Sequence, residues 1–196
     1  MQEPHGISDP GEVLIKDAIK ENIEIIPIPG ACAFVNALVA SGLSTTKFQF
    51  IGFLPVNVKE KEEILEDIKF NKNTLIFYEA PHKLIKTLGS MLKILGNRNI
   101  VLAKEITKIH ETFNRNTLEN LINELENEER IRGEFVILVE GSNITKKEKE
   151  KEDLSKLTFE EHYKYYEEQG FEKKEIIKKI AKDRNMNKNE VYQKFV

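Results

Sequence analysis

Three short segments carry residue types that could bind a ligand or transfer a proton. They are PGACA at residues 29–33, YEAPHK at residues 78–83 and AKE at residues 103–105, the last with further charged residues at 108–111. Each lies at the end of a segment that is predicted to form a strand. In an open α/β sheet, ligands bind beyond the carboxyl ends of the strands. These three segments are therefore the candidate binding positions.

The turn at residues 29–33 suits a ligand because its side chains are small. Glycine and alanine let the backbone approach a ligand closely, and the helix that follows begins with N–H groups that have no acceptor within the helix. The alternative is that the small residues only pack the helix against the sheet. At residues 78–83 and 103–105 the alternatives are an ordinary loop with a surface ion pair and a group of solvated charges.

Several familiar catalytic motifs are absent from the sequence. It contains no P-loop, no complete GxGxxG, no GxSxG and no metal-ligand spacing among its four histidines. No histidine lies near the single cysteine, Cys32, in the sequence, so we expect its thiol to have a packing role. Metal catalysis and nucleophilic thiol chemistry are not expected.

The composition is that of a soluble, globular protein with a strongly charged surface. Of the 196 residues, 40% are hydrophobic and 32% are charged. No run of about 18 apolar residues could span a membrane, and the first residues, MQEPHGISDPG, do not form a secretory signal. A single cysteine excludes an internal disulfide and suits a reducing compartment, so we expect a cytoplasmic protein.

Strands and helices alternate along the first 141 residues. Helices are predicted at residues 9–22, 31–41, 59–71, 81–96 and 117–129, and strands at residues 23–29, 48–54, 74–80, 99–105 and 133–141. The polar residues 107–116 are predicted to be a connection. This order predicts α/β layers around a largely parallel or mixed sheet whose central strands are buried on both faces.

The last third of the chain has a different pattern. Residues 142–156 have almost no apolar side chains and are predicted to form a flexible charged linker. Three short helices are predicted beyond it, at residues 159–170, 171–186 and 187–196, with a turn at residues 185–187. The pattern is similar to a helix-turn-helix unit, as is that of many small helical hairpins.

Basic residues are concentrated near the C-terminus. Residues 146–196 hold 14 Lys and Arg against 12 Asp and Glu, whereas residues 1–145 hold 16 against 21. Within residues 171–196, eight basic residues face four acidic ones. A basic end on an acidic body suggests a polyanionic partner, and the alternative is a solvated helix face.

Taken in order, the segments resemble one family. Over residues 6–141 the sequence is similar, in order and spacing, to the bacterial ribosomal RNA small subunit methyltransferase I family of the tetrapyrrole methylase superfamily. The matching segments are GISDPGEVLIKDAI, PIPGACAFVNALVASGL, FQFIGFLP, TLIFYEAPHKL, LAKEITKIHETF and GEFVILVEG. The resemblance implies transfer of a methyl group from S-adenosylmethionine to the ribose 2′-hydroxyl of a cytidine in small-subunit (16S) ribosomal RNA.

The resemblance also implies site residues. Seven positions match cofactor contacts: Gly30, Ala31, Cys32, Ala33, Tyr78, Ala103 and Phe135. The first four form the turn, and the other three would contribute an adenosine pocket from a second α/β domain. The helices of residues 157–196 resemble the C-terminal module of some members. Basic residues of this module would bind RNA phosphates: Lys173, Lys174, Lys178, Lys182, Arg184 and Lys188.

Members of the family begin with a further α/β region that holds a glycine-rich loop, whereas here only MQEPH precedes the matching segments. We therefore expect residues 1–45 to be the remnant of an N-terminal methylase domain and residues 46–141 to be the C-terminal α/β domain. Residues 142–156 would be the charged linker, and residues 157–196 the RNA-binding module. With half of the cofactor cleft absent, we expect this chain alone to bind S-adenosylmethionine weakly or not at all.

The expected reaction needs a ribose hydroxyl to attack a methyl group in line, so positioning would supply most of the acceleration. Glu79 and Glu105 are candidates for a base, and Lys104 could hold a phosphate or stabilise the alkoxide. The alternatives are a non-catalytic RNA-binding fragment and a methylase that acts on a tetrapyrrole, although a small macrocycle needs no basic tail. Family members pair through such domains, so a homodimer is a further expectation.

Overall fold

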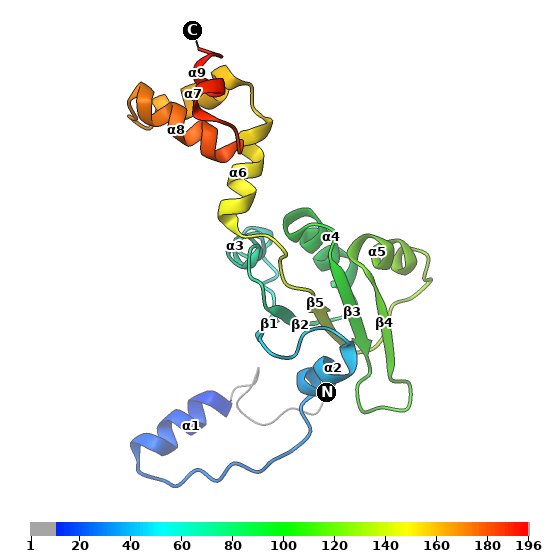
Figure 1. Ribbon diagram of the computed structural model, residues 1–196. Helices are drawn as coiled ribbons and strands as arrows, with labels where there is room; N and C mark the ends of the chain where they lie inside the picture. The colour runs from blue at the N-terminus through cyan, green and yellow to red at the C-terminus, as the bar shows by residue number, and fades with distance from the viewer. Residues whose placement is uncertain (1–10, 196) are drawn as a thin grey trace. The chain divides into compact units, whose positions relative to one another are not determined.

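The computed structural model describes residues 11–195, and Figure 1 shows its elements. The chain divides into two compact units, Met1–Asn143 and Ile144–Val196. The first unit contains a sheet with helices, and the second contains helices only. Within residues 11–195, no helix combines the length and hydrophobicity that a membrane crossing requires.

A five-stranded sheet forms the centre of the first unit. Its strands are β1 (Phe48–Phe53), β2 (Thr74–Glu79), β3 (Asn99–Lys104), β4 (Thr112–Thr117) and β5 (Phe135–Val139). The order across the sheet is β1-β2-β5-β3-β4; β1 and β2 are parallel, and the other neighbours are antiparallel. The sheet is therefore mixed, and its last strand in the sequence lies at its centre.

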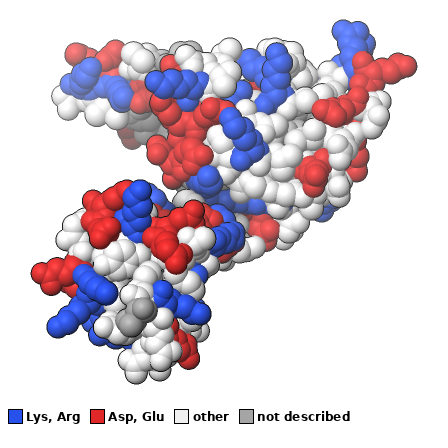
Figure 2. Space-filling view, turned by 90° about the horizontal axis from the view of Figure 1, so that it is seen from above, with Lys and Arg blue, Asp and Glu red and all other residues white. Residues whose placement is uncertain are grey.

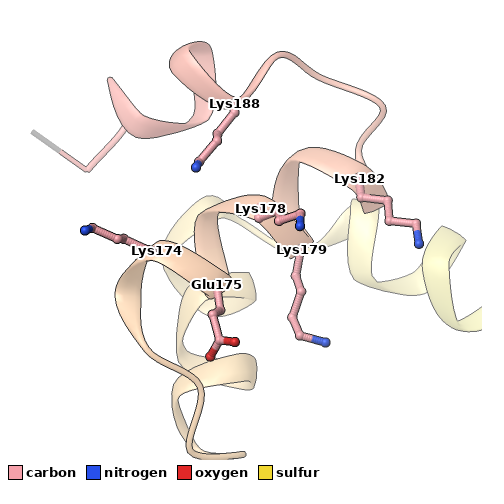
Figure 3. Close-up of a pocket in the computed structure, with 6 residues that line it drawn as sticks. All are labelled: Lys174, Glu175, Lys178, Lys179, Lys182 and Lys188. Carbon is pink, nitrogen blue, oxygen red and sulfur yellow. The ribbon is translucent and has the colours of Figure 1, made fainter.

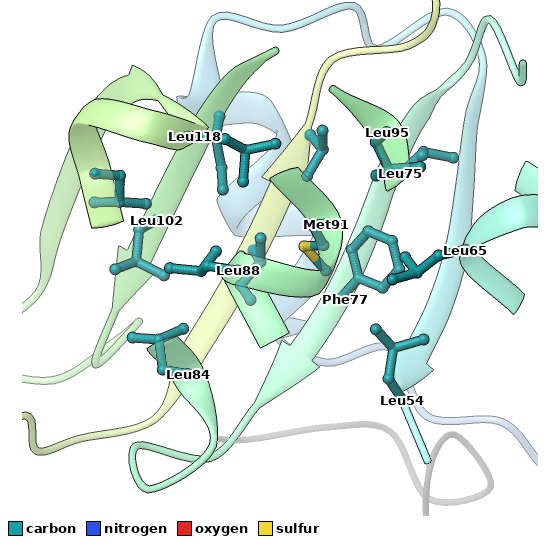
Figure 4. Close-up of a cluster of buried hydrophobic side chains, with 14 of the residues drawn as sticks. Leu54, Leu65, Leu75, Phe77, Leu84, Leu88, Met91, Leu95, Leu102 and Leu118 are labelled. Carbon is teal, nitrogen blue, oxygen red and sulfur yellow. The ribbon is translucent and has the colours of Figure 1, made fainter. Parts of the chain in front are cut away.

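Helices cover both faces of the sheet. As a result, β2 and β5 are buried at every position. One face packs against α3 (Val58–Ile68), α4 (Leu84–Leu95) and α5 (Leu118–Glu126), around the cluster shown in Figure 4. The other face packs against α2 (Ala33–Ser41). Side chains along each central strand alternate between these two faces, as the period of a strand requires. The predicted α/β layers are confirmed.

The strand predicted at residues 23–29 is not formed. These residues have no regular secondary structure and are exposed, with the side chain of Ile28 at 85%. The pattern of isoleucines suits a strand, but Pro27 and Pro29 lack the N–H group that a ladder needs. No described strand pairs with this segment.

Residues 112–117, predicted as part of a connection, form the edge strand β4. An edge strand pairs on one side only, so its composition can stay polar, and none of its six residues is fully buried. The apolar pattern that identifies a central strand is therefore missing from this segment.

The helix predicted at residues 9–22 is confirmed as α1 (Gly11–Lys20). Residues 9 and 10, where the helix was predicted to begin, lie outside the described residues. No residue of α1 is buried, and the side chains of Val13, Leu14 and Ile19 are each at least 60% exposed.

The second unit begins with α6 (Lys146–Lys156), where a flexible linker was predicted at residues 142–156. The expectation of an irregular segment relied on the lack of apolar side chains and missed this helix. A capping box formed by Thr145 and Glu148 begins the helix, and ion pairs one turn apart, such as Lys149 to Asp153 at 3.1 Å, stabilise its exposed side.

The three helices predicted beyond this segment are confirmed as α7 (Phe159–Glu167), α8 (Lys173–Asp183) and α9 (Lys188–Tyr192). One side of α8 supplies most of the core of this unit. The buried hydrophobic residues are Tyr166, Ile176, Ile177, Ile180, Ala181 and Val191. Leu154 of α6 packs against them, so α6 belongs to this small core.

A buried histidine ties α7 to the end of α8. The His162 side chain is 0% exposed, and its Nδ1 accepts a hydrogen bond from Arg184 Nε at 3.2 Å. Its Nε2 lies 3.4 Å from Asp183 Oδ2, which accepts the Tyr166 hydroxyl at 2.6 Å. Burial, and then the charge of Arg184, lower the pKa of His162 although Asp183 opposes the shift. The imidazole is therefore held in its neutral form.

This histidine makes the second unit sensitive to acid. Because the pKa is lower in the folded state, the unfolded state binds more protons below about pH 6.5. The contribution of His162 to the free energy of unfolding is fully present above that pH. It is lost as the pH decreases, by at most about 1.4 kcal/mol per pH unit. Urea unfolding of the intact chain at pH 7.5 and 5.5 checks this. Four of the five tyrosines lie in the unit and tryptophan is absent, so tyrosine fluorescence reports on it.

The control is His162→Gln, which keeps an acceptor for Arg184 but does not titrate. We expect the stability of this variant to change much less between the two pH values. An equal loss of stability in both proteins would show that another group is responsible.

Candidate functional site

Tyr78 and Ala103 lie in one row across the sheet. Tyr78 of β2 pairs with Val136 of β5, and Val136 pairs with Ala103 of β3. All three are buried on the face that α2 covers, in the same cluster as Ala33 at the start of α2. The structure thus brings together three of the seven predicted cofactor contacts, namely Ala33, Tyr78 and Ala103.

The side chain of Phe135 lies on the opposite face of the sheet. Phe135 precedes Val136 in β5, so it points toward α3, α4 and α5, where it is 2% exposed in the larger core. The structure does not bring this side chain to Tyr78 and Ala103. The backbone of Phe135 pairs with Glu79 and Lys104, one position beyond the row that contains Tyr78.

The turn before α2 is open. Gly30 and Ala31 are exposed, Cys32 is half-buried, and a side chain added at Gly30 would meet no atom within 4 Å. Cys32 is the N-cap residue of α2, and its side chain makes no capping hydrogen bond. The first N–H groups of α2 have no acceptor within the helix. A small anion or carbonyl could therefore bind at this helix start.

An aromatic cluster that the sequence reasoning missed lies beside this turn. The Phe34 ring stacks on Phe50 with 4.6 Å between centroids, and Phe50 meets Tyr78 edge-on at 5.0 Å. Phe53 also meets Tyr78 edge-on, with 5.6 Å between ring centroids. Phe50 and Phe53 are three residues apart, so regular strand spacing would send them to opposite faces. The register shift between Phe50 and Gly52 lets both reach Tyr78, and the sequence pattern alone does not predict that shift.

The candidate base Glu79 is held by the core of the protein. Its side chain is 3% exposed, Oε1 accepts the Ala80 N–H at 2.8 Å, and Oε2 accepts the Thr87 hydroxyl at 2.6 Å. The Thr87 oxygen in turn accepts from Lys61 Nζ at 3.3 Å. Both carboxylate oxygens are engaged on the side of α3 and α4, away from the α2 turn. This arrangement gives Glu79 a structural role.

Glu105 and Lys104 lie where β3 ends. Glu105 has a φ of 53°, and its Oε1 accepts the Glu134 N–H at 2.8 Å and Lys108 Nζ at 3.2 Å. The hydrogen bond from the Glu134 backbone, and then Lys108, lower the pKa of Glu105. Gly133, at a φ of 108°, packs so closely that an added Cβ would lie 3.1 Å from the Glu105 side chain and 3.2 Å from that of Lys104. Glu105 is therefore a fixed, ionised carboxylate and a weak base.

Four of the six predicted RNA contacts line one groove of the second unit. Its volume is about 460 Å³, and its lining residues are Lys174, Glu175, Lys178, Lys179, Lys182 and Lys188 (Figure 3). We call it the lysine groove. Lys179 and Glu175 were not predicted; the period of α8 could have identified them as neighbours of Lys178 and Lys182.

The other two predicted RNA contacts lie outside the lysine groove. Lys173 Nζ lies 5.8 Å from the centre of the Tyr192 ring. The guanidinium of Arg184 stacks on Phe159 at 4.1 Å, donates to the carbonyls of Leu157 and Thr158, and donates to His162. Arg184 is thus engaged inside the unit.

The hydrogen bonds of Thr87 can be tested by Thr87→Val, which keeps the shape and removes the hydroxyl. We expect the free energy of unfolding to fall by about 1 to 3 kcal/mol, because buried oxygens of Glu79 and the ammonium of Lys61 lose a partner. Urea unfolding followed by circular dichroism measures this. Ser90→Ala removes an exposed hydrogen bond on the same helix, from the Ser90 hydroxyl to the Lys86 carbonyl. It should change stability by less than about 0.5 kcal/mol. Equal losses of stability in the two variants would contradict the structural role of Glu79.

Comparison with known proteins gives one family. The family model described as Tetrapyrrole (Corrin/Porphyrin) Methylases matches residues 6–122. The chain is 50% identical, over 95% of its length, to the "Ribosomal RNA small subunit methyltransferase I" of Halalkalibacterium halodurans, and 45% identical, over 96%, to that of Bacillus subtilis. It spans 64% of the length of each.

Solved structures show the same fold. The methyltransferase CobJ aligns with a TM-score of 0.55 at 19% identity, over 72% of this chain and 63% of CobJ. The cobalamin biosynthetic enzyme CbiF, a cobalt precorrin-4 methyltransferase, aligns with a TM-score of 0.52 at 17% identity, over 70% and 61%. The family model matches more than half of the chain, and the layered mixed sheet agrees with it. The chain therefore belongs to the tetrapyrrole (corrin/porphyrin) methylase family.

Proposed function

We propose that this chain is part of an S-adenosylmethionine-dependent methyltransferase of small-subunit ribosomal RNA. The observation that carries the proposal is 50% identity, over 95% of the chain, to a protein of that name. We further propose that the acceptor is the ribose 2′-hydroxyl of a cytidine in 16S RNA and that the reaction takes place in the cytoplasm.

The residues around the α2 turn fit one side of a bound nucleoside cofactor. The open turn at Gly30 and Ala31 gives space for backbone contact, and Cys32 and Ala33 place the start of α2 beside it. Phe53, which is 53% exposed, offers flat surface for an adenine ring, and the buried Tyr78 ring supports it from below at 5.6 Å. Ala103 is buried in the same row as Tyr78, and the Phe135 backbone lies at the end of that row, so both would support the cofactor surface from behind.

S-adenosylmethionine supplies an electrophilic methyl group when it is bound. The ribose 2′-oxygen would take this methyl group as the bond from carbon to sulfur breaks, and the hydroxyl proton would pass to a base or to water. Glu79 is engaged in the core, and the lowered pKa makes Glu105 a weak proton acceptor. We therefore propose that Lys104 and Glu105 position the RNA, with Lys104 next to a phosphate.

The second unit supplies the RNA contacts in this proposal. Lys174, Lys178, Lys182 and Lys188 are exposed along the lysine groove. Lys173 lies beside them, whereas Arg184 acts through the fold of the unit. A second candidate function, RNA binding without catalysis, is favoured by the same groove. A second copy of the chain is also proposed as a partner, because Val39 and Phe48 are exposed at 69% and 43%.

Methylation can be tested directly. Small ribosomal subunits from a strain that lacks the enzyme are incubated with methyl-labelled S-adenosylmethionine and either this chain or a full-length relative. The RNA is digested, and its nucleosides are identified by mass spectrometry. We expect 2′-O-methylcytidine with the full-length relative. Label on a base, or on a nucleoside other than cytidine, would contradict the proposed acceptor; RNA binding with no label from either protein would favour the second candidate.

The cofactor contact at the turn can be tested by Gly30→Val, also introduced at the matching glycine of a full-length relative. The added side chain meets no protein atom within 4 Å, so the fold should be unaffected. It would occupy the space next to the cofactor, so we expect affinity for S-adenosylmethionine to fall at least about tenfold, or 1.4 kcal/mol. Calorimetry measures this.

The matched control is Gly89→Val, at an exposed glycine of α4 that also has nothing within 4 Å. This variant should bind as the parent does. Unchanged affinity of Gly30→Val in the full-length protein would place the cofactor elsewhere.

A further inference from the structure

The lining of the lysine groove is strongly basic. On the face shown in Figure 2, Lys and Arg are interspersed with Asp and Glu. In the groove, five of the six lining residues are lysines and one is acidic. We propose that the lysine groove binds consecutive phosphates of one RNA strand and does not read bases. This inference rests on the proposed function and specifies how the RNA is held.

The spacing of the lysines suits a linear polyanion. Lys174, Lys178 and Lys182 follow one another at intervals of four residues, so they share one side of α8 at steps of about 6 Å along its axis. The opposite side of α8 is buried in the core of the unit, which fixes the lysine side toward solvent. Lys188 extends from α9 toward α8 (Figure 3). Their ammonium groups can therefore meet different phosphates of one strand.

The chemistry of the lining favours phosphate over bases. An ammonium group is a compact charge without a fixed plane, whereas the planar ends of Arg, Asn and Gln present paired hydrogen-bonding groups that match base edges. None of these three residue types lines the groove. Arg184, the one arginine of α8 and its cap, donates its hydrogen bonds inside the unit. Contacts of this kind position RNA without specifying its sequence.

The neighbours of the lysines predict a graded effect. Lys179 Nζ lies 4.0 Å from the centre of the Phe171 ring and 5.1 Å from that of Tyr166, so its charge is already engaged. Glu175 adds a negative charge to the groove and should weaken phosphate binding. Its carboxylate also accepts the Glu172 N–H at 3.4 Å, a contact that glutamine can keep.

Fluorescence anisotropy of the full chain with labelled RNA tests the proposal. Two RNAs of equal length and unrelated sequence are titrated over a series of salt concentrations, without S-adenosylmethionine. Each of Lys174→Gln, Lys178→Gln and Lys182→Gln should reduce the slope of log affinity against log salt by about 0.7 to 0.9. Each should weaken binding to both RNAs by the same factor. Lys179→Gln should have a smaller effect, and Glu175→Gln should tighten binding.

The matched control is Lys164→Gln, on α7, whose side chain is 73% exposed and outside the groove. It should change neither the slope nor the affinity. Tyrosine fluorescence verifies that each variant is folded. Unchanged binding in the three lysine variants, a loss confined to one RNA, or no binding of RNA by the parent chain would overturn the inference. Groove-dependent binding without methylation by a full-length relative would support it and count against the proposed function instead.

Discussion

The complete burial of β2 and β5 is the constraint on which the first unit depends. Neither strand has an exposed position, so both faces of the sheet must be covered. Three helices cover one face with a large core, and α2 covers the other face with small residues. Because α2 carries alanines, its start lies close to the sheet, beside Tyr78 and Ala103. The candidate cofactor edge is thus a consequence of how the second face is covered.

The two faces also separate the charged residues by role. Glu79 and Tyr78 are neighbours in the sequence, but strand alternation sends Glu79 toward α4 and Tyr78 toward α2. A buried carboxylate needs hydrogen-bond partners, and Thr87 supplies one. The network that satisfies Glu79 therefore removes it from the surface where an RNA could lie.

Patterns that depend on burial were predictable from the sequence. The runs TLIFYE and FVILV identified the central strands, and the period of Ile176, Ile177 and Ile180 identified α8. Elements and contacts that depend on neighbouring strands or side chains were not predictable in this way. β4 is polar because only β3 pairs with it, and the residues of α6 form a helix through caps and ion pairs. For the same reason, the sequence could not show that Arg184, placed among the RNA contacts as a basic residue of the C-terminal module, is engaged by His162 and Thr158.

The position of β5 at the centre of the sheet has a consequence for biosynthesis. β2 and β3 share no ladder; each pairs with β5, which is the last strand to be translated. Until Phe135–Val139 leaves the ribosome, the nascent chain can hold only two separate pairs of strands, each with an unpaired apolar edge. Such edges invite pairing with other chains. The late insertion of one short strand closes both edges at once, so the first unit acquires its protection from aggregation in a single step near the end of its synthesis.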